Sequence, residues 1–198
     1  NRYFEPFLGG GALFFDTGPS SAILADANEE LVNCYHVVQT TPKKLLLALS
    51  EFRVGEKEYY EIRAINPIKL SNIERAARFL YLNKTCFNGL YRVNKQGQFN
   101  TPFGHFKNVN LAGEENLFRA SDLLQFAEVR CIDYHQLLMT ETKHGDFIYL
   151  DPPYLPISKY SDFKRYTKNF FYEEDHVRLA SLFRNLDQRG CKILLSNS

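Results

Sequence analysis

The two ends of the chain alternate short apolar runs with longer segments of helical hydrophobic spacing. Strands are predicted at residues 3–5, 21–26, 128–133, 146–150 and 191–196. Helices are predicted to begin at residue 12 and to span 28–39 and 173–188. Because consecutive strands joined by helices form parallel βαβ units, this rhythm predicts an α/β fold with a mostly parallel sheet.

The alternation of predicted strands and helices is interrupted in the middle of the chain. Helical spacing continues at residues 42–52, 56–65, 73–83 and 114–126, without intervening strands. The turn sequence Asn94-Lys95-Gln96-Gly97 lies between two short runs and predicts a β-hairpin. We therefore expect a sheet domain formed by residues 1–52 and 127–198, with a helical insert at 53–126. Strands lie close to both ends of the chain, so we expect this sheet domain to be incomplete at both ends.

Composition narrows the class of protein. The formal net charge over 198 residues is +1, so a nucleic-acid-binding surface would have to be local. No apolar run is long enough to span a membrane. The cysteines lack paired spacing, which indicates reduced thiols in a cytoplasmic protein and neither a disulfide framework nor a metal site. They are Cys34, Cys86, Cys131 and Cys191.

The tetrapeptide Asp151-Pro152-Pro153-Tyr154 directly follows the apolar run 147–150. Prolines stop a strand because they cannot donate to its ladder, so Asp151 is expected at the carboxyl end of a central strand. Ligands bind at that edge in open α/β sheets. A carboxylate, acceptor carbonyls and an aromatic ring suit a planar group with an exocyclic amine, such as a nucleobase. The alternative is a plain strand-ending turn.

A glycine-rich loop at residues 6–11 separates the first strand from the first helix. Such a loop lets a ligand approach the backbone closely. The spacing Phe7-x-Gly9-x-Gly11 lacks the full dinucleotide pattern and a P-loop lysine, which argues against a pyrophosphate ligand. Asp26 ends the second strand about 20 residues after the loop begins, where a carboxylate accepts from ribose hydroxyls. Alternatively, Asp26 caps the following helix.

Four predicted strands end in acidic residues: Glu5, Asp26, Asp133 and Asp151. If the strands are parallel, these carboxylates share one edge of the sheet and repel one another. A ligand with several donors and a positive charge would relieve that repulsion. S-adenosylmethionine has ribose hydroxyls, an adenine amine, an ammonium and a sulfonium, whereas a pyrophosphate cofactor would be repelled.

The region around the predicted hairpin is rich in Asn, Gln, Arg, Lys and aromatic residues. These side chains reach base edges, grip phosphates and stack on bases. A solvated polar hairpin is the alternative. Nucleic-acid binding is favoured because the region has many aromatic residues for a plain loop, namely Phe87, Tyr91, Phe99, Phe103 and Phe106.

The same blocks resemble the DNA adenine-N6 methyltransferases of the Dam type, an alpha-group amino methyltransferase family. Matching segments are residues 4–11, 25–28, 83–104 and 151–154, in the order cofactor loop, target-recognition insert and catalytic tetrapeptide. The family's Trp- and Lys-containing segment upstream of the first strand does not occur in this chain. The resemblance implies a Rossmann-like methyltransferase sheet whose helical target-recognition insert carries the hairpin.

For the cofactor S-adenosylmethionine, the resemblance implies that loop 7–11 wraps the methionine part and that Asp26 holds the ribose. Asp133 and Tyr134 would meet the adenine. The full expected cofactor set is Glu5, Pro6, Phe7, Gly9, Gly11, Asp26, Asp133, Tyr134 and Asp151. For catalysis, Asp151 and the Pro152 carbonyl would accept from the target N6 amine, and Tyr154 would stack on a flipped adenine.

For the DNA, the resemblance suggests double-stranded GATC. Arg92 is the expected guanine reader, Leu90 the contact to a thymine methyl, and Phe87 a wedge into the base stack. The full expected DNA-binding set is Phe87, Asn88, Leu90, Arg92, Asn94 and Pro102. We expect a monomer, with a cognate restriction endonuclease as a candidate partner.

Two alternatives stay open from the sequence. One is a methyltransferase that acts on another amine, such as cytosine N4, an RNA adenine or a protein amide. The other is a non-catalytic DNA-binding relative, which would not bind S-adenosylmethionine.

Overall fold

A computed structural model describes residues 1–94, 96–106, 109–111, 113–153, 171 and 173–196. The chain forms two compact units. Unit 1 combines Asn1–Glu29 with the described residues from Leu123 onward, and the described residues of unit 2 are those of Glu30–Asp122.

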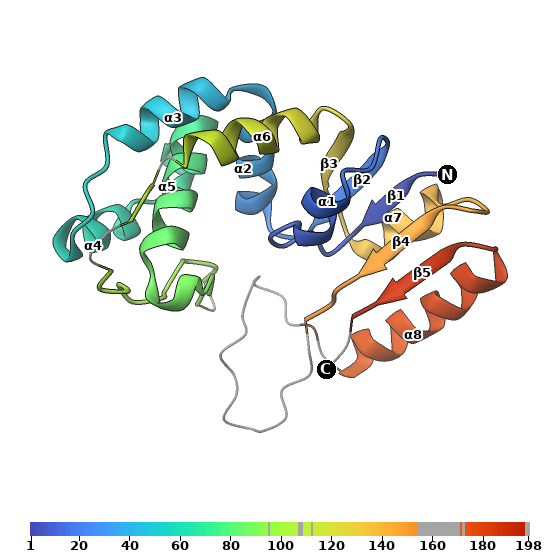
Figure 1. Ribbon diagram of the computed structural model, residues 1–198. Coiled ribbons are helices and arrows are strands. Elements are labelled where there is room, and N and C mark those ends of the chain that lie inside the picture. Colours follow the sequence, from blue (N-terminus) through green and yellow to red (C-terminus); the bar gives the residue numbers. More distant parts are fainter. Residues whose placement is uncertain (95, 107–108, 112, 154–170, 172, 197–198) are drawn as a thin grey trace. The chain divides into compact units, whose positions relative to one another are not determined.

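Unit 1 contains a five-stranded sheet in the order β3-β2-β1-β4-β5 (Figure 1). Every neighbouring pair is parallel, so the predicted α/β fold with a parallel sheet is confirmed. The strands are β1 (Tyr3–Glu5), β2 (Ala22–Asp26), β3 (Ala127–Cys131), β4 (Phe147–Leu150) and β5 (Lys192–Leu195).

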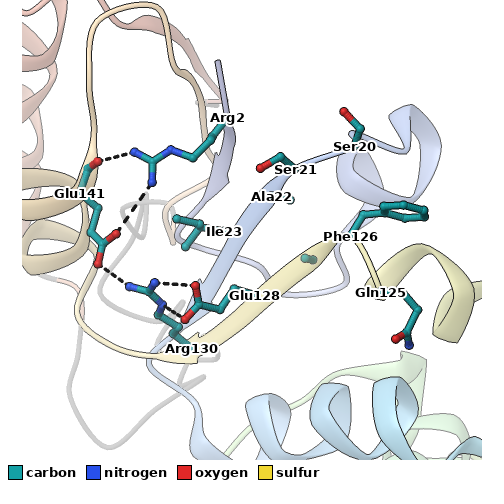
Figure 2. Close-up of a pocket in the computed structure, with 11 residues that line it drawn as sticks. Arg2, Ser20, Ser21, Ala22, Ile23, Gln125, Phe126, Glu128, Arg130 and Glu141 are labelled. Carbon is teal, nitrogen blue, oxygen red and sulfur yellow. Dashed lines mark hydrogen bonds and ion pairs between the residues drawn. The ribbon is translucent and has the colours of Figure 1, made fainter.

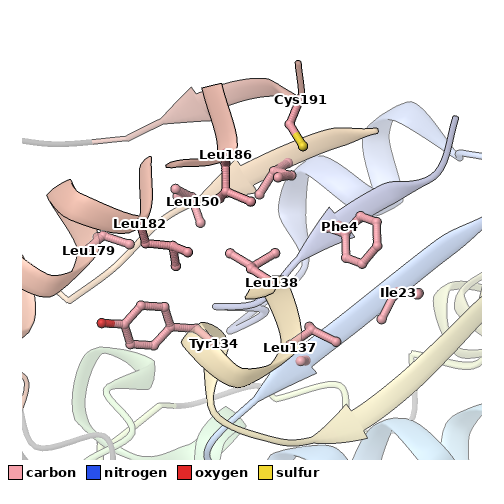
Figure 3. Close-up of a cluster of buried hydrophobic side chains, with 12 residues drawn as sticks. Phe4, Ile23, Tyr134, Leu137, Leu138, Leu150, Leu179, Leu182, Leu186 and Cys191 are labelled. Atoms are coloured by element: carbon pink, nitrogen blue, oxygen red, sulfur yellow. The ribbon is translucent and has the colours of Figure 1, made fainter. Parts of the chain in front are cut away.

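Within the described residues of unit 1, the helices are α1 (Ala12–Thr17), α7 (Tyr134–Glu141) and α8 (Glu173–Gln188). Side chains from β1, β4, α7 and α8 converge in one apolar cluster (Figure 3). Leu137 and Leu138 of α7, Phe4 of β1 and Leu150 of β4 are fully buried in it. The cluster holds α7 and α8 against one face of the sheet and thereby fixes the loops at the strand ends.

The sequence prediction missed helix α7. The sequence predicts that the preceding strand extends to Asp133. In the structure this strand, β3, ends at Cys131. Asp133 is the N-cap of α7, and its carboxylate accepts from the backbone N–H groups of His135 and Gln136 at 3.1 Å. The signal was present in the sequence, since a capping Asp precedes apolar residues at helical spacing.

Unit 2 is helical. Its elements are α2 (Glu29–Thr40), α3 (Pro42–Ser50), α4 (Glu56–Ala64), the 3₁₀ turn η1 (Pro67–Lys69), α5 (Asn72–Thr85), η2 (Phe87–Gly89) and α6 (Glu114–Leu124). Helix α5 begins with a capping box formed by Ser71 and Glu74. Each helix in the described parts of the chain is too short or too polar to cross a membrane.

Unit 2 begins earlier in the chain than the insert expected at 53–126. The reason is packing against α5. Helix α3 packs on α5, and Arg75 of α5 forms an ion pair with Glu30 of α2 at 2.6 Å. Helices α2 and α3 are therefore part of the same compact unit as the middle of the chain.

The predicted hairpin turns back on itself, but its described residues form no regular strand. We call residues 85–104 the hairpin segment. Its two arms pair through isolated antiparallel bridges, Cys86 with Phe103 and Val93 with Phe99. The expectation of two strands is wrong because η2 interrupts the ladder, where Asn88 adopts a positive φ of 53°.

Candidate active site

Acidic residues end neighbouring strands at one edge of the sheet in unit 1. Glu5 is the last residue of β1, Asp26 is the last residue of β2, and Asp151 directly follows β4. Since β2, β1 and β4 are adjacent and parallel, their carboxyl ends meet at the same edge, as the sequence predicted. We call this edge, together with loop 6–11, the strand edge.

Glu5 is buried at the strand edge, with 2% of its surface exposed. The Tyr3 hydroxyl donates to its Oε2 atom at 2.6 Å, because the two residues alternate onto the same face of β1. Burial raises the pKa of Glu5 to about 7, and the nearby Asp151 charge adds to this rise. Hydrogen bonds from Tyr3 and from the backbone N–H of Phe14 oppose the rise. Glu5 therefore changes its charge near neutral pH.

Asp26 joins the glycine loop to the start of α2. Its Oδ2 atom accepts from the N–H of Gly9 at 3.1 Å, and its Oδ1 atom accepts from the N–H of Asn28 at 2.8 Å. Burial raises the pKa of Asp26, whereas these backbone bonds lower it. Asn28 precedes the first residue of α2, so this bond closes a turn ahead of the helix, and capping of α2 by Asp26 stays a prediction. The same two bonds hold the carboxylate at the strand edge.

Backbone hydrogen bonds hold loop 6–11 against the sheet. The buried Leu8 donates its N–H to the carbonyl of Ala25 on β2 at 2.9 Å, and Gly11 donates to the carbonyl of Leu8 at 2.7 Å. Gly9 and Gly11 have positive φ angles of 47° and 62°, which favour glycine. A side chain added at Gly9 would meet no atom within 4 Å, so a ligand can approach the backbone there.

The remaining residues expected at the cofactor are mostly packed within unit 1. Pro6 is buried, and the ring of Phe7 lies 4.9 Å from that of Tyr134. Tyr134 has only 6% of its surface exposed and belongs to the apolar cluster in Figure 3. Asp133 is half-exposed, and its carboxylate lies 3.4 Å from the Arg178 guanidinium in addition to capping α7.

The catalytic tetrapeptide is described in part. Asp151 is exposed at the strand edge, and Pro152 is buried directly after it. Tyr154 lies outside the described residues. The described part of the tetrapeptide thus has an exposed carboxylate followed by a buried proline, and its role as a pair of acceptors stays a prediction.

A surface hollow lies at the other end of the same strands (Figure 2). It is lined by Ala22 and Ala127, the first residues of β2 and β3. Arg130 lies between two carboxylates there, 2.6 Å from both Glu128 and Glu141. The hollow includes the first residues of β2 and β3, whereas Glu5 and Asp26 are the last residues of their strands. Because the charges in the hollow are paired, the strand edge remains the candidate active site.

The donor set at the strand edge fits a cofactor with hydroxyl groups and positive charge. The carboxylates offer acceptors for hydroxyls and an ammonium group and would repel phosphates, and the open space beside Gly9 and Gly10 leaves room for a ligand. Among the described residues, no group of three or more His, Cys, Asp or Glu side chains is placed to hold a metal ion.

The aromatic residues of the hairpin region divide into two groups. Phe99 and Phe103 are buried, and the half-buried Tyr91 packs its ring 5.1 Å from that of Phe79. Only Phe87 and Phe106 of the expected set are largely exposed, by 53% and 43%. Interpreting all five aromatics as evidence for nucleic-acid contact was therefore wrong, because three of them build the core of unit 2.

The polar residues of the hairpin segment are organised by one another. The side chain of Arg92 contacts Asn100, which sequence reasoning did not single out. Asn94 shapes the turn, since its Oδ1 atom accepts from the N–H groups of Gln96 and Gln98. Leu90 is half-buried, whereas Asn88 and Pro102 are exposed. The expected DNA-binding residues thus lie on one segment, with different degrees of exposure.

The parallel sheet, the glycine loop and the acidic strand edge define an α/β fold of the methyltransferase type. Residues 1–198 match the family of D12 class N6 adenine-specific DNA methyltransferases. A Type II methyltransferase of Lactococcus lactis subsp. cremoris, M1.LlaDCHI, is 42% identical, with 100% of this chain and 72% of the relative covered. M.MjaIII of Methanocaldococcus jannaschii is 40% identical, with 100% and 73% covered.

A DNA adenine methylase of Escherichia coli K12 is 34% identical, with 98% of this chain and 70% of the relative covered. The chain therefore belongs to the D12 class of adenine-specific DNA methyltransferases. The family resemblance expected from the sequence is confirmed, and so is the class of enzyme.

Proposed function

We propose that this adenine-N6 DNA methyltransferase uses S-adenosylmethionine as its methyl donor and acts on a flipped-out adenine within GATC. The observation that carries the proposal is the strand edge, where Glu5, Asp26 and Asp151 end adjacent parallel strands beside the glycine loop. Acceptors gathered in this way suit a cationic cofactor and a target amine together.

The cofactor site is proposed to extend along the strand edge. Glu5, Pro6 and loop 7–11 would enclose the methionine part, and Asp26 would accept from the ribose hydroxyls. Asp133 and Tyr134 would lie beside the adenine. Since Tyr134 is buried and its ring packs on that of Phe7, its contribution would be to hold Phe7 in place. When bound, S-adenosylmethionine supplies an electrophilic methyl group on a sulfonium.

The target amine is proposed to bind at the end of β4. The carboxylate of Asp151 and the carbonyl of Pro152 would accept from the two N6 hydrogens, which orients the nitrogen lone pair for attack. The amine gains positive charge in the transition state, and Asp151 would stabilise that charge. Tyr154, which the tetrapeptide alone assigns, would stack on the adenine and contribute about 1–3 kcal/mol.

The adenine has to leave the base stack to reach this site, because a base inside a duplex is not accessible to the methyl donor. Unpairing and unstacking cost a few kcal/mol. The exposed Phe87 is proposed to wedge into the stack and offset part of that free energy.

Sequence selection is proposed to reside in the insert formed by residues 53–126. Arg92 would pair bidentately with a guanine, and Leu90 would contact a thymine methyl. Asn88, Asn94 and Pro102 would complete the contact set. The GATC assignment rests on the resemblance of segment 83–104 to Dam-type enzymes.

Two of the relatives are named Type II methyltransferases, which favours a role beside a restriction endonuclease that acts on the same site. We propose that the protein acts as a monomer on duplex DNA in the cytoplasm. Deleting a neighbouring endonuclease gene, where one exists, should make loss of the methyltransferase harmless to the cell.

Two measurements test the proposed donor and the flipping step. Calorimetric titration should show binding of S-adenosylmethionine but not of NAD, since phosphates meet carboxylates at the strand edge. A duplex with 2-aminopurine at the target adenine should gain fluorescence on binding as the base unstacks. A protein that binds DNA but ignores S-adenosylmethionine would instead be a non-catalytic relative.

A further inference from the structure

Asn100, on the opposite arm of the hairpin segment, forms hydrogen bonds with Arg92. The Nε atom of Arg92 donates to Oδ1 of Asn100 at 2.9 Å, and Nη2 donates to the Asn100 carbonyl at 3.4 Å. The N–H of Asn100 donates in turn to the Arg92 carbonyl at 2.9 Å. Asn100 therefore fixes both the backbone and the guanidinium of Arg92.

Asn100 itself is attached to a buried anchor. The next residue, Thr101, has 1% of its surface exposed. Its carbonyl accepts from the Tyr59 hydroxyl at 2.8 Å and from Arg63 at 3.0 Å, both on α4. Its hydroxyl donates to the carbonyl of Leu90 at 2.6 Å. Both arms of the segment are thereby tied to one point on unit 2.

A second anchor lies on the other side of the pair. Val93 directly follows Arg92, and Phe99 directly precedes Asn100. Val93 and Phe99 form an antiparallel bridge. Both are buried, with 3% and 9% of their surfaces exposed. The Arg92–Asn100 pair thus lies between two fixed points, so its geometry is set by the folded unit before DNA binds.

Fixing an arginine before binding has a direct effect on recognition. The arginine side chain has many rotamers, and immobilising it on binding opposes association. A hydrogen bond at Nε already restricts the side chain in the free protein, so less conformational entropy is lost when DNA binds. It also selects the edge used for recognition, because bidentate pairing with guanine would then use Nη1 and Nη2.

We propose that Asn100 is a positioning residue for sequence readout, which holds the Arg92 guanidinium in the orientation that pairs with guanine. This proposal rests on the proposed guanine-reading role of Arg92. It differs from a purely structural role in shaping the hairpin segment. A structural residue would alter the binding of all duplexes equally.

The test compares the methylation kcat/KM for a duplex with guanine against one with 7-deazaguanine, which lacks the N7 acceptor, at the first position of the site. Asn100→Ala should lower this ratio about threefold to tenfold, as expected for one released side chain. Arg92→Ala should abolish the preference, and Asn100→Ala should have no further effect in that background.

Two further variants make the result specific. Asn100→Asp keeps an acceptor for Nε and should restore most of the ratio, even if its charge lowers overall DNA affinity. Gln98→Ala changes an exposed amide in the same segment that pairs with the side chain of Asn94, and should leave the ratio unchanged. Thermal unfolding of each variant verifies that the unit is folded.

The outcomes separate the two claims. If Asn100→Ala slows methylation of both duplexes by the same factor, Asn100 has only a structural role and the inference is wrong. The same conclusion follows if its effect adds fully to that of Arg92→Ala. If Arg92→Ala alone leaves the ratio intact, the guanine-reading role of Arg92 fails first, independently of Asn100.

Discussion

The strand edge of unit 1 and the hairpin segment of unit 2 position their polar residues by different means. At the strand edge, Glu5 and Asp26 are the terminal residues of parallel strands, so the sheet topology alone brings them together. In the hairpin segment, Arg92 owes its orientation to Asn100 and to the buried Thr101 anchor. The first arrangement follows from strand order, and the second depends on individual side-chain contacts.

This difference predicts different responses to mutation. Removing a carboxylate at the strand edge should affect chemistry or cofactor binding and leave the sheet intact. In the hairpin segment, neighbouring residues should divide between those that stabilise unit 2 and those that contact DNA. The following predictions test that contrast, beginning with the largest expected effect.

Asp151→Ala should reduce kcat for methyl transfer by roughly 10²–10³-fold or more, because the transition-state charge on the amine loses its partner. The fold should persist, since Asp151 is exposed. Asp187→Ala on α8 removes an equally exposed carboxylate and serves as the control. Single-turnover kinetics give the measurement, and unchanged turnover in Asp151→Ala would remove this residue from catalysis.

Tyr91→Ala and Phe87→Ala should affect different properties, the first mainly stability and the second mainly DNA binding. Tyr91 packs on Phe79 and Phe99, so its truncation should lower the free energy of unfolding by about 2–4 kcal/mol. Phe87 is exposed, so its truncation should change unfolding by only about 0.5 kcal/mol. It should instead weaken DNA binding by about 1–3 kcal/mol. Denaturant titrations and DNA-binding isotherms distinguish the two; equal losses of stability would contradict the division of the aromatics.

Asp26→Ala should weaken S-adenosylmethionine binding roughly tenfold to hundredfold, since a charged acceptor is lost and loop 6–11 loses its bond at Gly9. Calorimetric titration provides the affinity. DNA binding should be unaffected. Asp16→Ala changes an exposed acid on α1 and should bind the cofactor normally. Wild-type affinity in Asp26→Ala would show that the ribose is held elsewhere.

The raised pKa of Glu5 should make the free energy of unfolding depend on pH. Its pKa is raised in the folded state to about 7, so the folded protein holds a proton that the unfolded chain releases at lower pH. The stabilisation is complete below the usual carboxyl pKa and is lost as pH rises through about 7, by roughly 1–3 kcal/mol. Glu5→Gln should flatten this loss between pH 5 and pH 8 in thermal unfolding. An unaltered pH profile in the variant would rule Glu5 out as its source.

The sequence was sufficient to predict the sheet and most helices because their hydrophobic periods are strong. Parallel pairing then followed from the alternation of strands and helices, and it correctly brought Glu5, Asp26 and Asp151 to one edge. Helix α7 was missed because Asp133 was interpreted as a strand end, although a capping aspartate looks the same in sequence.

The hairpin segment was harder to predict because composition does not distinguish buried from exposed aromatic residues. Phe99 and Phe103 pack on distant residues of α4 and α5, which no local pattern reveals. The contact between Arg92 and Asn100 likewise depends on how the two arms pair. The positive φ of Asn88 in η2 is likewise not evident from the sequence, although asparagine is one of the few residues that tolerate it.

The central claim is that the strand edge transfers a methyl group to adenine N6 at a site selected by unit 2. The most direct test is transfer of labelled methyl from S-adenosylmethionine to two duplexes, one with GATC and one with its adenine replaced, followed by nucleoside analysis. Labelled N6-methyladenine is expected from the GATC duplex alone. Equal labelling of both duplexes would contradict the GATC assignment, and the absence of label despite cofactor binding would contradict the proposed substrate.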